Sequence, residues 1–103
     1  MNVRNAMDNN SNINSNCLEL HAIIHGDVQG VGFRATAMHY AQQLKLDGIV
    51  RNCSDGTVEM FVQGDRKELE MLLAQLKVSH RITLIDTEFS TPSHSYAGFK
   101  ITH

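Results

Sequence analysis

The segment at residues 26–34, GDVQGVGFR, constrains the fold most, because it joins an alternating apolar stretch to a helical pattern. Its three glycines allow backbone conformations that are closed to residues with a Cβ atom, so several N–H groups can point at one small anion. The helix that follows adds the positive end of its dipole, and Arg34 adds a planar charged group that matches two phosphate oxygens. We therefore predict a phosphate-binding loop with backbone donors from Gln29, Gly30, Val31, Gly32 and Phe33.

A second segment, GIVRNCSDGTV at residues 48–58, ends a predicted strand at Asn52, just before a turn. A neutral amide beside a bound phosphate can hold a water molecule. Taken alone, Asn52 is equally well explained as a turn-forming residue, and the glycine segment as an ordinary turn. Arg34 is harder to explain as a surface residue, because a positive charge at a helix start opposes the helix dipole. The two segments together favour a phosphate site.

The composition indicates one globular domain in which any anion must be bound locally. A chain of 103 residues with 42% hydrophobic residues can form one modest core. The net charge of −2 provides no broad basic surface for nucleic acid or for an acidic membrane. No apolar run approaches the roughly 18 residues of a membrane span, and no signal peptide is recognisable. We therefore expect a cytoplasmic protein without a membrane partner.

The cysteines and histidines form no recognisable metal-binding pattern. Cys17 and Cys53 are expected at opposite ends of the sheet, about 20 Å apart, which is too far for a disulfide. His21 and His25 share one face of a predicted strand but are separated by about 13 Å. We therefore predict no metal site.

Hydrophobic periodicity predicts seven elements after an Asn- and Ser-rich flexible tail at residues 1–16. Strands are predicted at residues 18–25, 48–53, 57–63, 81–89 and 97–101, and helices around residues 33–44 and 65–76. Leu46, Asp47 and Gly48 are expected to close the first helical segment. Asp65 and Glu68 resemble a capping box, and the second helix carries an apolar stripe of Leu69, Leu72, Leu73 and Leu76.

This order, βαββαβ with a terminal strand, predicts an α+β ferredoxin-like sandwich. We expect an antiparallel sheet of order 4-1-3-2, a short additional C-terminal strand and two helices on one face. The first and third strands are then central neighbours, so the glycine loop and the turn after Asn52 meet at one end of the sheet. Arg51 is expected to point the opposite way from Asn52, into solvent.

The two segments resemble the signatures of the acylphosphatase family. The first signature, GxVQGVxFR, is matched by Gly26, Val28, Gln29, Gly30, Val31, Phe33 and Arg34. The second is matched by Gly48, Val50, Arg51, Asn52, Gly56, Val58 and Gly64. The likeness extends over residues 18–101, and two linked motifs are more specific than either alone. We expect an acylphosphatase-like domain at residues 17–103.

The resemblance implies hydrolysis of the carboxyl–phosphate bond of acylphosphates, with Arg34 and Asn52 as the catalytic pair and no metal or organic cofactor. The partner is then a small acylphosphate and not a nucleic acid, and we expect the protein to act as a monomer. One position departs from the family pattern, because Ile49 stands where an aromatic residue is usual. Asp27 stands at a variable position that is often filled by a basic residue. We expect Asp27 to face solvent, where it disturbs anion binding little.

Two other functions fit parts of the pattern. RNA-recognition domains share the βαββαβ order but display two or three aromatic residues on the open sheet face, and Phe61 is the one plausible candidate in this sequence. An accessory phosphate-binding domain, of the kind found in larger carbamoyl-transfer maturation proteins, would keep the loop without acting as a free enzyme. Hydrolysis of benzoyl phosphate, and its loss on substitution of Arg34, separates these alternatives.

Overall fold

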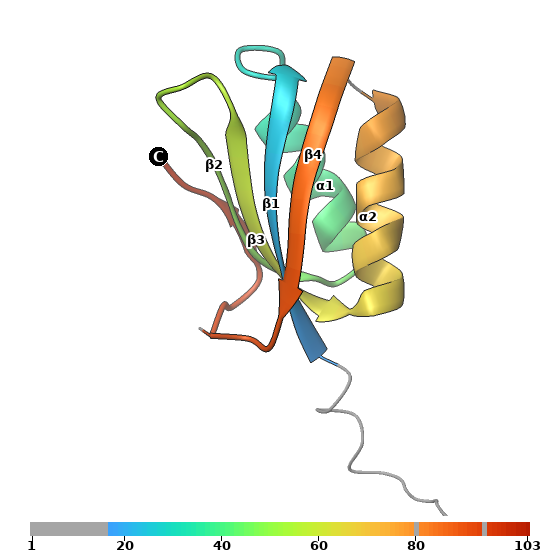
Figure 1. Ribbon diagram of the computed structural model, residues 1–103. Coiled ribbons are helices and arrows are strands. Elements are labelled where there is room, and N and C mark those ends of the chain that lie inside the picture. Colours follow the sequence, from blue (N-terminus) through green and yellow to red (C-terminus); the bar gives the residue numbers. More distant parts are fainter. Residues whose placement is uncertain (1–16, 80, 94) are drawn as a thin grey trace, which may run out of the picture.

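The computed structural model describes residues 17–79, 81–93 and 95–103, so the predicted tail lies outside the described residues. The predicted order of elements is confirmed (Figure 1). The elements are β1 (Cys17–Asp27), α1 (Phe33–Gln43), β2 (Asp47–Asn52), β3 (Val58–Asp65), α2 (Arg66–Ser79), β4 (Arg81–Ser90) and β5 (Phe99–Ile101). No helix within the described ranges is long and apolar enough to span a bilayer.

The strands form one sheet in the order β4-β1-β3-β2-β5, which confirms the predicted order 4-1-3-2 with a fifth, C-terminal strand. β1 pairs antiparallel with β3 and β4, and β2 pairs antiparallel with β3. β5 differs, because it runs parallel to β2. The sheet is therefore mixed and not wholly antiparallel as predicted, and β2 lies between β3 and β5.

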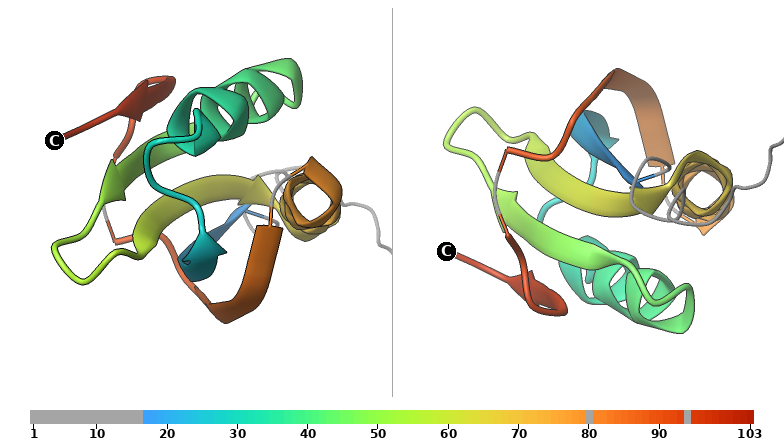
Figure 2. Two further views of the ribbon diagram at one scale, coloured as in Figure 1. Left: turned by 90° about the horizontal axis from the view of Figure 1, so that it is seen from above. Right: turned by 90° about the horizontal axis from the view of Figure 1, so that it is seen from below.

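The core lies between the sheet and both helices, which pack on the same face (Figure 2). Alternate residues of β1 and β3 point into it, and one face of each helix closes it. Fully burying one Val, Leu, Ile, Phe or Met side chain contributes about 1.5–3 kcal/mol to the free energy of unfolding. Leu73, predicted as part of the stripe on α2, is half-buried at the margin. The residues with 0–1% exposure include Leu20, Ala22, Ile24, Phe33, Ala37, Ala41, Val58, Met60, Val62, Leu69, Leu72 and Leu76.

Helix α1 ends within a residue of the predicted position, but the residue that turns the chain after it differs from the prediction. Lys45, and not Gly48, takes the left-handed conformation that turns the chain, with φ 58°. Its N–H donates to Gln42 O at 3.1 Å, and the next N–H, of Leu46, donates to Ala41 O at 2.9 Å. These two bonds form the Schellman pattern of a helix end. Gly48 lies in β2, within the predicted strand, where a Cβ atom would collide with the carbonyl oxygen of Phe61.

The sheet face away from the helices carries a polar and aromatic cluster. The rings of His21 and Phe61 stack with centroids 4.4 Å apart. Glu59 contacts His21 at 2.6 Å and Arg51 at 2.7 Å, so Arg51 points outward as predicted. Burial raises the pKa of Glu59, but the hydrogen bonds from His21 and Arg51 outweigh it and hold that pKa below its ordinary value.

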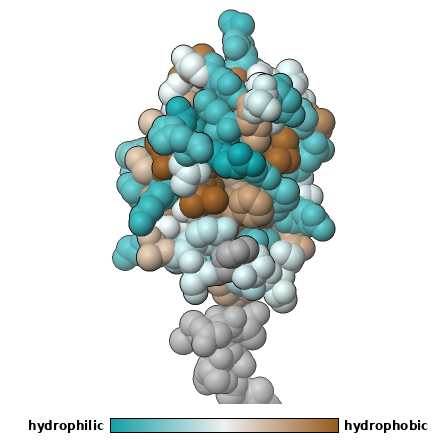
Figure 3. Space-filling model, turned by 90° about the vertical axis from the view of Figure 1, so that its left-hand side faces the viewer, coloured by the Kyte–Doolittle hydropathy of each residue, from teal (hydrophilic) through white to brown (hydrophobic). Residues whose placement is uncertain are grey.

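Seen from the side opposite α2 (Figure 3), hydrophobic residues gather near the centre of the surface, among hydrophilic ones.

We predict that Lys45→Gly raises the free energy of unfolding by about 1 kcal/mol, because glycine adopts the left-handed conformation without the steric cost of a Cβ atom. Urea denaturation measures the change. Gln43→Gly is the matched control on the last helical residue, and it should lower the free energy of unfolding by about 1 kcal/mol. A Lys45→Gly protein that is no more stable than the parent would contradict the assigned helix end.

Candidate functional site

The glycine loop leaves β1 at Asp27 and enters α1 at Phe33. Gly30 and Gly32 have φ of 75° and 81°, and apart from their chain neighbours no described residue has an atom within 4 Å of a Cβ built on either glycine. These two glycines are therefore required for their backbone conformation and not for lack of space. Gly32 is the N-cap of α1, and no side chain caps the helix there. The first N–H groups of a helix have no partner within it, so the loop and helix start can bind an anion.

The loop and Asn52 face one small cavity of about 160 Å³. Asn52 is the last residue of β2, so it projects from the sheet end that also carries the loop. Its Oδ1 atom is buried and accepts no hydrogen bond from any residue that the structure describes. A buried polar atom of this kind usually has a partner, such as a water molecule or a ligand. The cavity is lined by Val28, Gly30, Gly32, Phe33, Arg34, Ala35, Asn52 and Ile101.

Arg34 is held at the cavity by the C-terminal part of the chain. Its Nη1 atom lies 3.2 Å from Nδ1 of His103, which can accept a hydrogen bond from the guanidinium when the ring is neutral. The Thr102 N–H donates to Val50 O at 2.9 Å and keeps this segment beside β2. Arg34 thus projects from α1 and is contacted by a residue that follows β5.

The structure brings five of the predicted site residues to the cavity: Gly30, Gly32, Phe33, Arg34 and Asn52. Gln29 and Val31 are not among its lining residues. The Gln29 side chain reaches the β2–β3 turn, and Val31 is 49% exposed. The donation of backbone N–H groups to phosphate by the loop residues remains a prediction for Gln29, Gly30, Val31, Gly32 and Phe33.

Sequence reasoning missed Ile101 and His103. Both reach the site because β5 returns parallel to β2, and a strand of three residues leaves no local signal of its partner. Val28 and Ala35 were also missed as lining residues, although both are neighbours of the predicted loop and helix start. Proximity to the motif was the one available signal for these two.

The turn between β2 and β3 is tightly organised. Asp55 Oδ1 accepts hydrogen bonds from the Oγ1 of Thr57 at 2.6 Å and from its N–H at 3.1 Å. These bonds, the side-chain one foremost, hold the pKa of Asp55 below its ordinary value. Cys53 N–H donates to Thr57 O at 2.9 Å, and Gly56 N–H donates to Cys53 O at 3.2 Å. The residue after Asn52 is therefore fixed within a hydrogen-bonded turn.

The remaining side chains considered from the sequence lie outside the cavity. Asp27 is exposed, as expected. Cys17 and Cys53 are free thiols. His21 contacts Glu59, whereas His25 contacts Asp86 at 3.0 Å. Within the described part of the chain, no group of three or more potential ligands could hold a metal ion.

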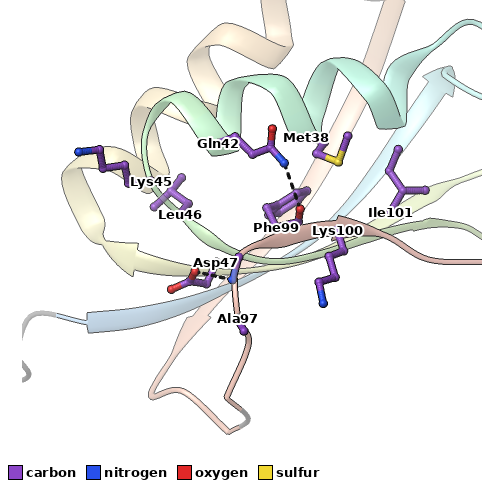
Figure 4. Close-up of a pocket in the computed structure, with 10 residues that line it drawn as sticks. Met38, Gln42, Lys45, Leu46, Asp47, Ala97, Phe99, Lys100 and Ile101 are labelled. Atoms are coloured by element: carbon purple, nitrogen blue, oxygen red, sulfur yellow. Dashed lines mark hydrogen bonds between the residues drawn. The ribbon is translucent and has the colours of Figure 1, made fainter.

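A larger groove of about 750 Å³ lies between α1 and β5 (Figure 4). Gln42 Nε2 donates to Phe99 O across it at 3.4 Å, and Gly98 N–H donates to Asp47 Oδ1 at 2.9 Å. The groove adjoins the small cavity through Ile101, which lines both. Neither the loop glycines nor Asn52 line it, so the convergent polar groups belong to the smaller cavity.

Comparisons with known proteins agree with this geometry. A family model described as Acylphosphatase matches residues 20–101. An acylphosphatase of Roseiflexus sp. (strain RS-1) is 37% identical over 84 residues, which cover 79% of this chain and 90% of that protein. The crystal structure of acylphosphatase from Bacillus subtilis has a TM-score of 0.80 and 31% identity, covering 84% of this chain and 99% of that one. The structure of T. kodakarensis HypF has a TM-score of 0.74 and 27% identity, covering 82% of this chain and 12% of that one.

We predict that Thr57→Val raises the pKa of Asp55 towards its ordinary value, because the strongest donor to the carboxylate is removed. Since the folded pKa is the lower one, Asp55 stabilises the fold above about pH 4, and this contribution is lost as the pH falls through the folded pKa. Carboxyl-carbon NMR titration measures the shift. Thr87→Val, on an exposed position of β4, is the control, and an Asp55 pKa that is unchanged in Thr57→Val would contradict the assignment.

Proposed function

Because this chain belongs to the acylphosphatase family and has that family's activity, the hydrolysis of acylphosphates, we propose that the carboxyl–phosphate bond is broken in the cavity between the glycine loop and Asn52. The observation that carries this proposal is that Asn52 lines the same cavity as Arg34 and has a buried Oδ1 that accepts no hydrogen bond from the described residues. An acceptor in that place suits a water molecule next to a bound phosphate.

In this mechanism the loop and Arg34 bind the phosphoryl group. The backbone N–H groups of the loop, the positive end of α1 and the guanidinium supply donors and positive charge around the cavity of about 160 Å³. Charge spreads over the equatorial phosphoryl oxygens in the transition state, so donors fixed in advance lower the barrier. Because guanidinium has five N–H donors, Arg34 can keep its contact with His103 while it binds phosphate oxygens.

Asn52 then orients the attacking water. Its Oδ1 accepts one water hydrogen, which directs a water lone pair at phosphorus in line with the leaving carboxylate. The new P–O bond forms as the acyl C–O–P bond breaks on the phosphorus side, and the carboxylate leaves with the electron pair. An amide is a poor base, so the water proton passes to a phosphate oxygen of the substrate. Carboxylate is a good leaving group, and the proposed steps therefore require no metal or organic cofactor.

One chain supplies the residues that line the cavity and the His103 that contacts Arg34. We therefore propose that the protein acts as a monomer on a small acylphosphate. The alternative of an accessory phosphate-binding domain, to which the HypF similarity is relevant, predicts phosphate binding without turnover. Steady hydrolysis of benzoyl phosphate above its spontaneous rate favours the enzyme.

We predict different losses for the two proposed catalytic residues. Arg34→Ala should lower turnover by about 1000-fold or more and weaken inhibition by inorganic phosphate more than about tenfold, because it removes a charged ligand of the phosphoryl group. Asn52→Ala should lower kcat by about 100- to 1000-fold and leave phosphate inhibition nearly unchanged, because it removes a group that acts on the water. Benzoyl phosphate hydrolysis measures both effects.

Arg51→Ala is the matched control for these variants, since Arg51 neighbours Asn52 in β2 but pairs with Glu59 on the opposite face. It should keep the parental kcat and phosphate inhibition. Parental turnover in Arg34→Ala or in Asn52→Ala would refute the proposed site.

We predict that the pH dependence of kcat shows no ionisation of a general base on the enzyme. The value of kcat should stay constant from about pH 6 to 8 in His103→Asn, which removes the imidazole that contacts Arg34, because the proton goes to the substrate. Initial rates at saturating benzoyl phosphate provide the measurement. The difference between the pH profiles of the parent and of His103→Asn gives the effect of His103 on kcat. A fall in kcat on the acid side in His103→Asn would show that a protein group accepts the proton.

A further inference from the structure

The Gln29 side chain links the glycine loop to the turn that follows Asn52. Its Nε2 atom donates to Cys53 O at 2.7 Å and to Thr57 O at 2.8 Å. The carboxamide has two N–H donors, so these two bonds use both. We propose that Gln29 is a positioning residue, which fixes Asn52 relative to the bound phosphoryl group. This inference rests on the function proposed above for Asn52.

The two carbonyl groups that accept from Gln29 lie at the base of the β2–β3 turn. Cys53 O also accepts from Gly56 N–H, and Thr57 O also accepts from Cys53 N–H. The turn is thus closed on itself by backbone bonds, and Asp55 strengthens it further. Its internal bonds set its shape but not its distance from the loop. The bonds from Gln29 span 24 and 28 residues in sequence and set that distance.

Asn52 depends on this link because it is joined directly to Cys53. Its Oδ1 accepts no hydrogen bond from the described residues, so that atom is placed by the backbone of Asn52 and by packing. A displacement of Cys53 therefore moves the carboxamide that orients the water. The loop end of the link is equally short, since Gln29 directly precedes Gly30 at the cavity. One side chain thus couples the position of the phosphate ligands to the position of the water ligand.

The expected cost falls on turnover and not on phosphate binding. In-line attack is sensitive to geometry, and a misplacement of 1 Å can cost about a hundredfold in rate. The loop backbone and Arg34 do not require the Gln29 carboxamide as a donor. Both acceptor carbonyls keep a backbone partner when Gln29 is replaced, so no buried carbonyl is left without a hydrogen bond and the fold is retained.

The first test compares Gln29→Met, which keeps the size of the side chain and removes its donors, with Gln43→Met on the exposed surface of α1. Gln29→Met should lower kcat for benzoyl phosphate about tenfold and change inhibition by inorganic phosphate less than about twofold. Gln43→Met should change neither value. A parallel loss of phosphate inhibition would overturn the proposal, because it would place the effect of Gln29 in the loop.

The second test is a double-mutant cycle with Asn52→Ala. If Gln29 acts through Asn52, then Gln29→Met should lower kcat no further than about twofold in the Asn52→Ala background. Effects that multiply in the double variant would overturn the proposal. Parental kcat in Asn52→Ala alone would instead refute the proposed role of Asn52, so the two failures are distinguishable.

A third measurement is independent of activity. In the parent, amide resonances of residues 52–57 and of the loop should both respond to inorganic phosphate in a titration followed by NMR. In Gln29→Met the loop resonances should still respond, whereas those of residues 52–57 should be displaced before phosphate is added and should lose their response. An unchanged turn in Gln29→Met would overturn the proposal even if the variant were inactive for another reason.

Discussion

The pairing of β1 with β3 determines where the site can form. Ile24 lies opposite Val58, so the chain leaves β1 beside the place where it enters β3. The loop that follows β1 and the turn that precedes β3 are consequently neighbours, although they lie far apart in sequence. A shift of one residue in this register would turn the buried side chains of one of the two strands towards solvent, either Leu20 and Ala22 of β1 or Met60 and Val62 of β3. The hydrophobic core therefore fixes the register, and the register brings Arg34 and Asn52 to one cavity.

The features predictable from the sequence are those that local chemistry determines. Alternating apolar residues identified β1 and β3, helical spacing identified α1 and α2, and the right-handed crossovers reduced the topologies to one sheet order. The convergence of Arg34 with Asn52 followed from that order and needed no knowledge of side-chain contacts. Ile24 and Val58 were both predicted on the buried face, and this alternation sets the register.

The features that were missed depend on contacts distant in sequence. β5 is three residues long, and nothing in its sequence indicates a parallel partner, so the reach of Ile101 and His103 into the site was not predicted. The end of α1 was predicted to within a residue, but the residue that turns the chain was not, because Gly48 is a plausible helix terminator. A Cβ atom at Gly48 would collide with β3, and this is why glycine is needed there. Lys45 turns the chain instead, at a steric cost that its sequence does not reveal. Gln29 was assigned to the loop backbone, whereas its side chain serves the opposite turn.

The short strand β5 has a consequence for how activity responds to heat. It is held to the domain by a few bonds, among them Gly48 N–H to Gly98 O and Thr102 N–H to Val50 O, and by the buried ring of Phe99. Segments with so few bonds open at a lower free energy than the sheet to which they attach. When β5 detaches, Arg34 loses its neighbour His103 and the cavity loses the wall formed by Ile101. The same event bares the edge of β2 to other chains. Warming should therefore lower kcat and promote self-association while the other four strands and both helices are still folded.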